Sequence, residues 1–316
     1  MTWIKALNIV KNQIIGETVP ASTTILNGVE KPRVEYIHLN LNKYAADIIT
    51  NVLLPARSDQ SAWDSIIDER ISLMQYTRED RINYFRSQDW SRDVWNNMYL
   101  IFYSSIFIPR IQIDIIDALK KLNVNTLNTL HIYDIGIGTG TTILAAITLF
   151  KSLYDIYIDS PQTFPITNII FHLYDTNIGA IKYNENMANQ FQDHKNDSFI
   201  DFTFKFFNQS ASALSDKSFE NNSIVCTFNT LEDFGEDVSN GIFQLFDRIR
   251  LDNCIFIIGE YYSRNRNLLS HINHQTRNEL VTSHSYGRVP DRRIFSWLKF
   301  EGIWNRVIIG PFRPSL

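Results

Sequence analysis

The chain has 316 residues and a formal net charge of −4, with 44% hydrophobic and 20% charged residues, which is the ordinary composition of a globular protein that can bury a full core. No apolar run reaches the ~20 residues needed to cross a bilayer, and residues 1–15 lack the apolar core of a signal peptide, so we expect a cytoplasmic protein with no membrane partner. The two cysteines, Cys226 and Cys254, are too few for a disulfide framework and lack metal-ligand spacing.

The first part of the chain is predicted to be mainly helical. Residues 1–41 show no clear periodicity, although residues 33–39 could form a short strand or an extended arm. Helical spacing of apolar residues then predicts helices over 42–54, 61–76, from 77 onward, 90–107, and from Pro109 to about 122. We therefore expect a helical N-terminal region over 1–125, joined by a short polar turn to an α/β domain over 126–316.

The predicted helix over 90–107 is unusually rich in aromatic residues, among them Tyr99 and Tyr103. Core packing against the next helix is one interpretation of this pattern. The other is that Tyr99 and Tyr103 face a ligand crevice and form part of a substrate pocket.

The stretch from His131 to Gly140 has the most informative pattern in the chain. Residues 131–135 are predicted to form a short buried strand, glycines follow at alternate positions 136, 138 and 140, and an apolar helix is predicted from Thr141. Glycine permits positive φ and lets a ligand lie directly on the backbone, while the helix start offers unpaired N–H groups. A nucleotide crevice is therefore predicted here. The dinucleotide fingerprint G-x-G-x-x-G does not fit, because Thr141 occupies the place of its third glycine.

The pattern D-x-G-x-G-x-G, with Asp134 at its start, resembles the first motif of the class I S-adenosylmethionine-dependent methyltransferases. The resemblance implies an α/β fold with a doubly wound, mostly parallel seven-stranded sheet that ends in an antiparallel hairpin. It also implies the cofactor S-adenosyl-L-methionine. In that family the acid matched by Asp134 holds the methionyl amino group, directly or through water, and the loop matched by Gly136, Gly138 and Gly140 lies under the cofactor.

Two further strand ends are candidates for contacts with the cofactor. Asp175 follows an apolar run over 168–174, where a carboxylate can accept hydrogen bonds from the ribose hydroxyls; the alternative is that it only caps the helix predicted over 177–191. The distance from Gly136 is 39 residues rather than the ~20 of dinucleotide sites, so residues 154–168 must form an insertion. Asn208 and Gln209 follow the aromatic strand predicted over 199–207, where many methyltransferases place an Asp against adenine. Amides can also pair with the adenine edge.

The reacting methyl group is expected beside the ends of the fourth and fifth strands, over 223–228 and 253–259. Carboxyl ends of neighbouring strands at the switch point of such a sheet line one crevice. A helix is also predicted over 238–249. The alternative to catalysis is therefore that the acids after the fourth strand cap this helix. The candidates that orient or deprotonate the acceptor are Asn229, Glu232, Asp233 and Tyr261, with Glu260 beside them in contact with the substrate, and Asn229 is also a candidate cofactor contact.

The last part of the chain is basic. Residues 261–313 contain nine Lys or Arg and three acids, a net charge of +6 that leaves −10 on the remainder. Arg264, Arg266 and Arg288 are expected to rim the opening above the cofactor, which suggests a polar or anionic acceptor. His271 and His274 have no further ligand at metal spacing and are read as surface residues. Residues 293–300 and 303–309 are predicted to pair as a hairpin around Glu301 and Gly302.

These patterns predict a methyltransferase that transfers a methyl group to an oxygen or nitrogen atom of a small molecule or metabolite enclosed by the N-terminal helices. A peptide, a protein or an RNA that binds the basic 261–313 segment is the alternative acceptor, although the overall charge does not suggest a nucleic-acid binder. A module that kept the fold and lost the chemistry is the third hypothesis.

Overall fold

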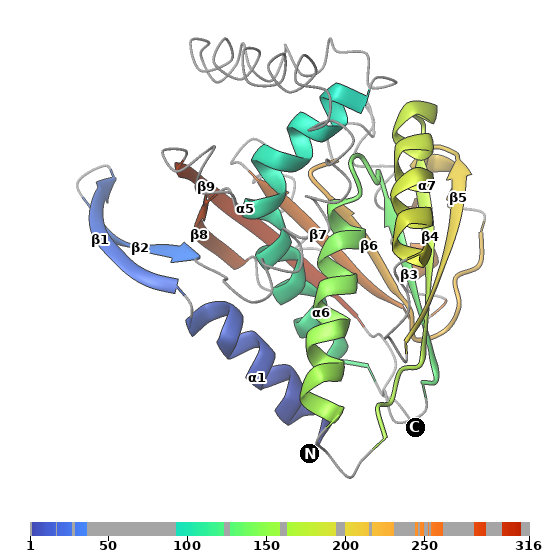
Figure 1. Cartoon of the computed structure of the whole chain (residues 1–316), viewed down its shortest axis with the longest axis horizontal. Helices are drawn as coiled ribbons and strands as arrows, with labels where there is room; N and C mark the ends of the chain where they lie inside the picture. Colours follow the sequence, from blue (N-terminus) through green and yellow to red (C-terminus); the bar gives the residue numbers. More distant parts are fainter. Residues whose placement is uncertain are drawn as a thin grey trace.

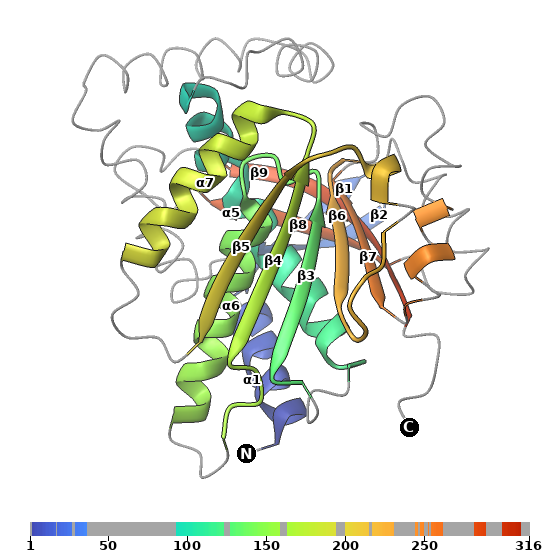
Figure 2. The ribbon, with the colours of Figure 1, turned by 90° about the vertical axis from the view of Figure 1, so that its right-hand side faces the viewer.

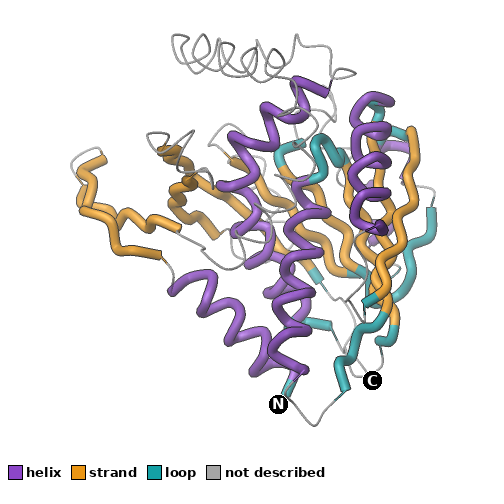
Figure 3. Tube along the Cα trace, in the orientation of Figure 1, coloured by secondary structure: helices purple, strands orange, loops and turns teal. Residues whose placement is uncertain are grey.

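The computed structural model describes residues 2–16, 18–26, 29–36, 93–122, 127–158, 163–193, 200–214, 217–230, 244–245, 247–249, 252, 254–261, 281–288 and 299–310. Figure 3 shows how helices and strands are distributed along this trace. The elements in chain order are α1 (Trp3–Gly16), β1 (Thr18–Leu26), β2 (Val29–Tyr36), α5 (Asp93–Leu119), β3 (Thr129–Ile135), α6 (Thr141–Ile158), β4 (Asn168–Asp175), α7 (Ile178–Asp193), β5 (Asp201–Asn208), the 3-10 helix η2 (Ala211–Leu214), β6 (Ile224–Phe228), β7 (Ile255–Tyr261), β8 (Val281–Arg288) and β9 (Lys299–Ile309).

The strands form one sheet with the order β1-β2-β8-β9-β7-β6-β3-β4-β5 (Figure 1). Strands β7, β6, β3, β4 and β5 are mutually parallel, β9 is antiparallel to β7, and β8 is antiparallel to β9. The predicted fold class, an α/β protein with a mostly parallel sheet that ends in an antiparallel pair, is confirmed. The described sheet has nine strands rather than seven because β1 and β2 extend it beyond β8.

Helices α1, α5, α6 and α7 lie on one face of the sheet (Figures 1 and 2). Alternate residues of β4 point into this layer, where Ile169, Phe171 and Leu173 are fully buried. The opposite face has its own, smaller apolar cluster, to which the helical residues Leu245 and Ile249 contribute. The sheet is therefore covered on both faces, as a doubly wound sheet requires. No described helix is long and apolar enough to cross a membrane.

Helix α5 differs from the two helices predicted over 90–107 and from Pro109. It is continuous from Asp93 to Leu119, with Pro109 inside it. A proline within a helix loses one hydrogen bond and crowds the preceding turn, at a cost of about 3 kcal/mol. Here Phe107, Ile108 and Ile111 are almost completely buried on both sides of the proline, so the packing of the helix offsets this cost.

The two ends of the chain also differ from prediction. Residues 18–26 and 29–36 form the antiparallel strands β1 and β2 within a region predicted to be mainly helical. Residues 33–36 of β2 agree with the strand alternative for 33–39. The predicted hairpin around Glu301 and Gly302 is wrong, because β9 runs straight through these residues and pairs with β8 instead. A Glu-Gly pair resembles a turn, whereas the polar sequence of β8 gives little strand signal. The helices predicted between 42 and 92 lie outside the described residues.

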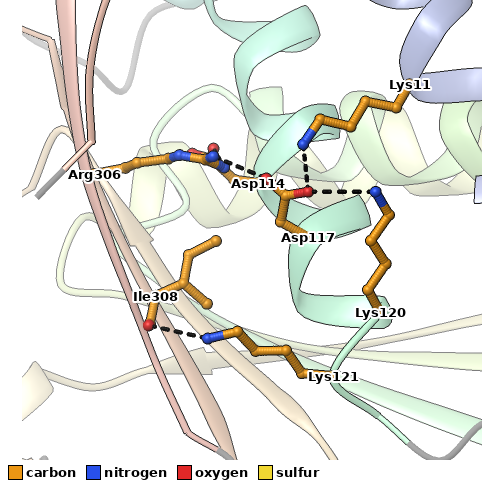
Figure 4. Close-up of polar contacts among 7 residues, drawn as sticks. All are labelled: Lys11, Asp114, Asp117, Lys120, Lys121, Arg306 and Ile308. Carbon is orange, nitrogen blue, oxygen red and sulfur yellow. Dashed lines mark hydrogen bonds and ion pairs between the residues drawn. The ribbon is translucent and has the colours of Figure 1, made fainter. Parts of the chain in front are cut away.

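A cluster of charged side chains joins α5 to its neighbours (Figure 4). Arg306 on β9 donates from Nη1 to Asp114 at 2.6 Å and from Nη2 to Asp117 at 2.8 Å. Lys11 on α1 donates to the other oxygen of Asp117 at 2.5 Å. Burial alone would raise the pKa of Asp117, but the hydrogen bond from Lys11 and the charge of Arg306 outweigh it and lower this pKa. The side chain of Asp114 is only 1% exposed, and Arg306 places a positive charge next to it in this buried position.

This cluster predicts that substitution of Arg306 strongly lowers the stability of the fold. Arg306→Ala should lower the free energy of unfolding by about 3–5 kcal/mol, because it removes the guanidinium group that pairs with the buried carboxylate of Asp114. Urea unfolding measures the change. Lys120→Ala is the control, since Lys120 lies 3.8 Å from Asp117 at the surface of the cluster and should change stability by no more than about 0.5 kcal/mol. A loss below about 1 kcal/mol for Arg306→Ala would show that apolar packing alone holds α5 on the sheet.

Candidate cofactor site

The candidate site lies where the carboxyl ends of β3, β4 and β6 meet. Strand β3 has β4 on one side and β6 on the other, so the chain order reverses between β3 and β6. Ligands of open α/β sheets bind in the crevice at this reversal. The glycine loop 136–140 follows β3 at this point, and Asn229 and Thr230 follow β6.

The three glycines of the loop all have positive φ, of 78°, 49° and 76° for Gly136, Gly138 and Gly140. A Cβ atom on Gly136 would overlap the side chain of Thr230, and one on Gly140 would overlap Asn184. A Cβ atom on Gly138 would have no neighbour within 4 Å among the described residues. Gly136 and Gly140 therefore permit close packing within the protein, whereas Gly138 is the place where another molecule can approach the backbone.

Hydrogen bonds to two elements, β4 and α7, hold this loop in position. The backbone N–H groups of Gly136 and Ile137 donate to the carbonyl oxygen of Tyr174, at 2.8 and 3.3 Å. The N–H of Gly138 donates to Oδ2 of Asp175 at 3.0 Å. The carbonyl of Gly138 accepts a hydrogen bond from Nδ2 of Asn184, on α7, at 2.8 Å. The loop is thus fixed before any ligand binds.

Asp134 is a buried carboxyl group near the end of β3, two residues before the loop. The residue is 1% exposed, and its Oδ2 atom has no hydrogen-bond partner among the described residues. Burial raises the pKa of Asp134 to about 7; a hydrogen bond from Thr142 lowers it, the charge of Asp175 raises it further, and a hydrogen bond from Cys226 lowers it. The Cys226 Sγ atom lies 3.8 Å from Oδ1. A cationic group next to Oδ2 would compensate for the cost of ionising this carboxyl.

Asp175 binds the loop and is not the cap of α7. Its Oδ1 accepts from the N–H of Asn177 at 2.8 Å, while Asn177 itself caps the helix by accepting from Gly179 at 2.8 Å and from Ala180 at 3.3 Å. Burial raises the pKa of Asp175, and hydrogen bonds from the backbone of Asn177, Gly138 and Thr176 oppose the rise. The alternative that Asp175 only caps a helix does not describe its contacts.

Asn208 and Gln209 lie beside Asp175. Asn208 is the register partner of Asp175, and its Nδ2 donates to the backbone oxygens of Asp175 and Thr176, at 3.3 and 3.1 Å. The side-chain oxygen of Gln209 accepts from Lys217 at 2.5 Å. The amide of Asn208 therefore holds the turn after β4, whereas that of Gln209 joins the end of β5 to Lys217.

Asn229 and Glu260 are neighbours on the other side of β3. Asn229 has a φ of 59°, a conformation that asparagine tolerates better than most residues, and its N–H donates to the carbonyl of Gly259 at 2.9 Å. Glu260 is 5% exposed and lies near the carboxyl end of β7. Adjacent parallel strands thus bring these two predicted residues together, as expected.

The remaining predicted residues are only partly described. Glu232, Asp233, Arg264 and Arg266 lie outside the described residues. The backbone, but not the side chains, is described for Tyr99 and Tyr103 in α5, Tyr261 at the end of β7 and Arg288 at the end of β8. Among the residues that are described, no group of three or more His, Cys, Asp and Glu side chains could hold a metal ion.

Two further residues that shape the loop, Asn184 and Thr230, were not predicted from the sequence. Asn184 is fully buried and lies on the same side of α7 as Ile181, Met187 and Ala188, which are also buried. An amide within an apolar helical stripe is the signal that could have identified it. Thr230 fills the space beside Gly136 and donates to the carbonyl of Ile135 at 3.4 Å. No sequence pattern indicates this contact.

No protein-family model matches this chain, and no curated protein matches it. Solved structures with a similar fold include precorrin 8w decarboxylase from Methanobacterium thermoautotrophicum, with 11% identity, a TM-score of 0.41 and coverage of 64% of this chain and 89% of that one. Precorrin-6y C5,15-methyltransferase from Geobacter metallireducens has 10% identity, a TM-score of 0.40 and coverage of 63% and 88%. An rRNA methylase from Streptococcus thermophilus has 8% identity, a TM-score of 0.35 and coverage of 61% and 92%. These similarities are too distant to place the chain in a family.

The raised pKa of Asp134 predicts how stability depends on pH. An unfolded aspartate loses its proton near pH 3.9, whereas the folded protein keeps this proton until about pH 7. This group therefore lowers the free energy of unfolding as the pH rises from about 4 to about 7, and not further above that range. Asp134→Asn, which cannot ionise, should be more stable relative to wild type at pH 8 than at pH 4.5. Urea unfolding at both pH values measures the difference.

The control for this measurement is Asp155→Asn, which removes an exposed carboxyl group from α6 and corrects for the general loss of one negative charge. An equal difference between Asp134→Asn and wild type at the two pH values would show that Asp134 ionises without penalty in the folded protein.

Proposed function

We propose that this chain is an S-adenosylmethionine-dependent methyltransferase whose cofactor lies along residues 134–140 and beside Asp175. One arrangement carries the proposal. Gly138 is open to an approaching molecule, and its N–H donates to the carboxylate of Asp175, at the reversal point of a mostly parallel sheet. The loop that holds Gly138 follows directly on the strand that carries Asp134, whose buried Oδ2 has no partner among the described residues. Two carboxylates near an open glycine suit a ligand that has both an ammonium group and a ribose.

Asp134 would bind the ammonium group of the methionyl part, directly or through water. Its Oδ2 atom has acceptor capacity that no described residue uses. Charge-assisted hydrogen bonds are about twice as strong as neutral ones, and a cation stabilises the ionised form of a buried acid. Binding should therefore lower the pKa of Asp134 and release a proton near neutral pH.

Asp175 would bind the ribose through the acceptor capacity that its backbone contacts leave. Three backbone N–H groups already donate to this carboxylate. A carboxylate has about four acceptor sites, so one ribose hydroxyl fits, rather than the two expected from the sequence. Asn208 and Gln209, next to Asp175, lie where the adenine edge would be bound.

When bound, the cofactor supplies a methyl group on a positively charged sulfur. The protein then has to position the acceptor in line and to exclude water. Asn229 and Glu260 are the described candidates on the side of the acceptor, and Tyr261, Glu232 and Asp233 are further candidates for orienting or deprotonating it. We propose a small molecule or metabolite as the acceptor, with Tyr99 and Tyr103 of α5 as candidates for its pocket.

The basic 261–313 segment supports an anionic peptide or RNA acceptor less strongly than its charge suggested. Arg306, one of its nine cations, is bound to Asp114 and Asp117 on the helical side of the sheet. It is therefore engaged in holding α5. The cations Arg264, Arg266 and Arg288 remain candidates for binding an acceptor of this kind.

Calorimetry with S-adenosylmethionine and S-adenosylhomocysteine tests the cofactor site. Gly138→Val should abolish the binding of both ligands, since a branched side chain would occupy the open space above the loop. Asp134→Asn should weaken binding roughly 10–100-fold, the loss expected for a charged hydrogen bond, and Asp175→Ala about 10-fold. Thermal unfolding confirms that each variant folds.

Asn177→Ala is the matched control for Asp175→Ala, because it removes the cap of α7 without touching a proposed ligand contact. It should lower the melting temperature and leave affinity unchanged. Near-native affinity of Gly138→Val would contradict the proposed site.

Methyl transfer from a radiolabelled donor to fractions of small metabolites, peptides and RNA identifies the class of acceptor. We expect label in the small-molecule fraction. Glu260→Gln should then lower kcat at least about 10-fold and leave cofactor affinity within about 2-fold, as expected for a group that acts at the acceptor. Cofactor binding without transfer to any fraction would favour the catalytically silent module.

A further inference from the structure

Strand β5 forms one edge of the sheet (Figure 2). It pairs with β4 along its whole length, from Asp201 opposite Asn168 to Asn208 opposite Asp175. Within the described part of the chain, no strand pairs with its other side. An edge of this kind presents a row of backbone donors and acceptors to which another strand can bind.

The hydrogen bonds of β5 show which backbone groups face outward. The N–H of Asp201 donates to the carbonyl of Thr167 at 2.8 Å, and that of Gln209 donates to Asp175 at 3.1 Å, so odd-numbered residues face β4. Successive residues of a strand direct these groups to opposite sides. The N–H and C=O groups of Phe202, Phe204 and Phe206 therefore face the open edge.

The side chains of β5 differ between the two faces of the sheet. Asp201, Thr203 and Lys205 are exposed on one face. Phe202 and Phe204 lie on the other face, partly buried, with their rings stacked on Phe171 at centroid distances of 6.3 and 5.2 Å. One face thus presents an acid and a base four residues apart, and the other presents aromatic rings.

We propose that β5 pairs with β5 of a second copy of this chain, antiparallel, with the two-fold axis at Thr203. Phe202 of each copy then lies opposite Phe204 of the other and exchanges both backbone hydrogen bonds with it. Asp201 of each copy lies opposite Lys205 of the other, in a position without backbone hydrogen bonds, where side chains are closest. Two opposite-charge pairs and two aromatic pairs form at once, and such pairs stabilise a sheet.

The charges select this register among the alternatives. A shift by one residue would direct the outward groups of one strand at the inward groups of the other, which prevents pairing. With the axis at Phe204, Asp201 would lie opposite Phe207, and with the axis at Lys205, two lysines would lie opposite each other. Only the axis at Thr203 pairs Asp201 with Lys205.

The dimer has two structural consequences and does not depend on the proposed function. The sheets of the two copies become continuous, and the candidate cofactor sites lie at opposite ends of the joined sheet because β5 is antiparallel to its copy. A single pair of strands buries less than the ~800 Å² per partner of stable interfaces, so we expect a dimer that dissociates on dilution.

Sedimentation equilibrium of the full chain, from micromolar to millimolar concentration, tests the proposal. Wild type should form dimers reversibly. Lys205→Asp and Asp201→Lys should each raise the dissociation constant at least about 10-fold, because each places like charges opposite each other twice. The double variant D201K/K205D restores both pairs with the charges exchanged and should dimerise within about 3-fold of wild type.

Lys182→Glu on α7 is the control, since it makes the same change in charge sign as Lys205→Asp at an exposed site away from β5. Thermal unfolding checks that all variants fold. A wild-type chain that stays monomeric at 1 mM would overturn the proposal. An increase in association for Lys205→Ala would also overturn it, because it would show that Lys205 protects the edge from pairing. Failure of the double variant to restore dimers would overturn the register.

Discussion

Parallel strands bring their carboxyl ends to one edge of a sheet, and this constraint builds the candidate site from segments that are far apart in the sequence. Asp134, Asp175 and Asn208 end or nearly end three successive strands of the sheet, and Asp175 and Asn208 are direct register partners. The N–H of Gly138 then reaches the carboxylate of Asp175 across 37 residues of chain. None of these contacts depends on a long side chain reaching over the surface. They follow from register, and a shift of one strand would remove them all.

The register on the other side of the site depends on α5. Arg306 of β9 lies opposite Gly259 of β7, the residue before Glu260, and its guanidinium group is held by two carboxylates of α5. The cluster therefore ties the helix layer to β9, the strand that pairs with the Glu260-bearing β7. Lys11 links α1 to one of these carboxylates, that of Asp117. An ion cluster with a buried member is costly to break and tolerates few other geometries, so it specifies position more than it adds stability.

The central sheet and the glycine loop could be predicted because their signals are local. An apolar strand, alternating glycines and a helix start lie within about twenty residues, and each has a direct physical meaning. Contacts between distant elements left no such signal. Nothing in the neighbourhood of Asn184 or Thr230 shows that one meets Gly140 and the other Gly136. Likewise, the sequence shows Arg306 only as one more cation of a basic segment. Its pairing with Asp114 becomes visible only in the structure. The prediction of a turn at Glu301 and Gly302 is wrong because these residues pair with β8, whose polar sequence gives little indication of a strand.

The site costs the folded protein stability, and this cost is an argument that a ligand completes it. Burial raises the pKa of Asp134 to about 7, which penalises folding at higher pH, and one of its oxygens has no partner in the described part of the chain. Gly136 and Gly140 are required by the packing of Thr230 and Asn184. Gly138 instead adopts its positive φ where no described neighbour requires the absence of a side chain. Proteins keep such features where they serve binding. A cation at Asp134 that also covers Gly138 would compensate for both costs together, and a ligand with only one of these properties would leave the other cost in place.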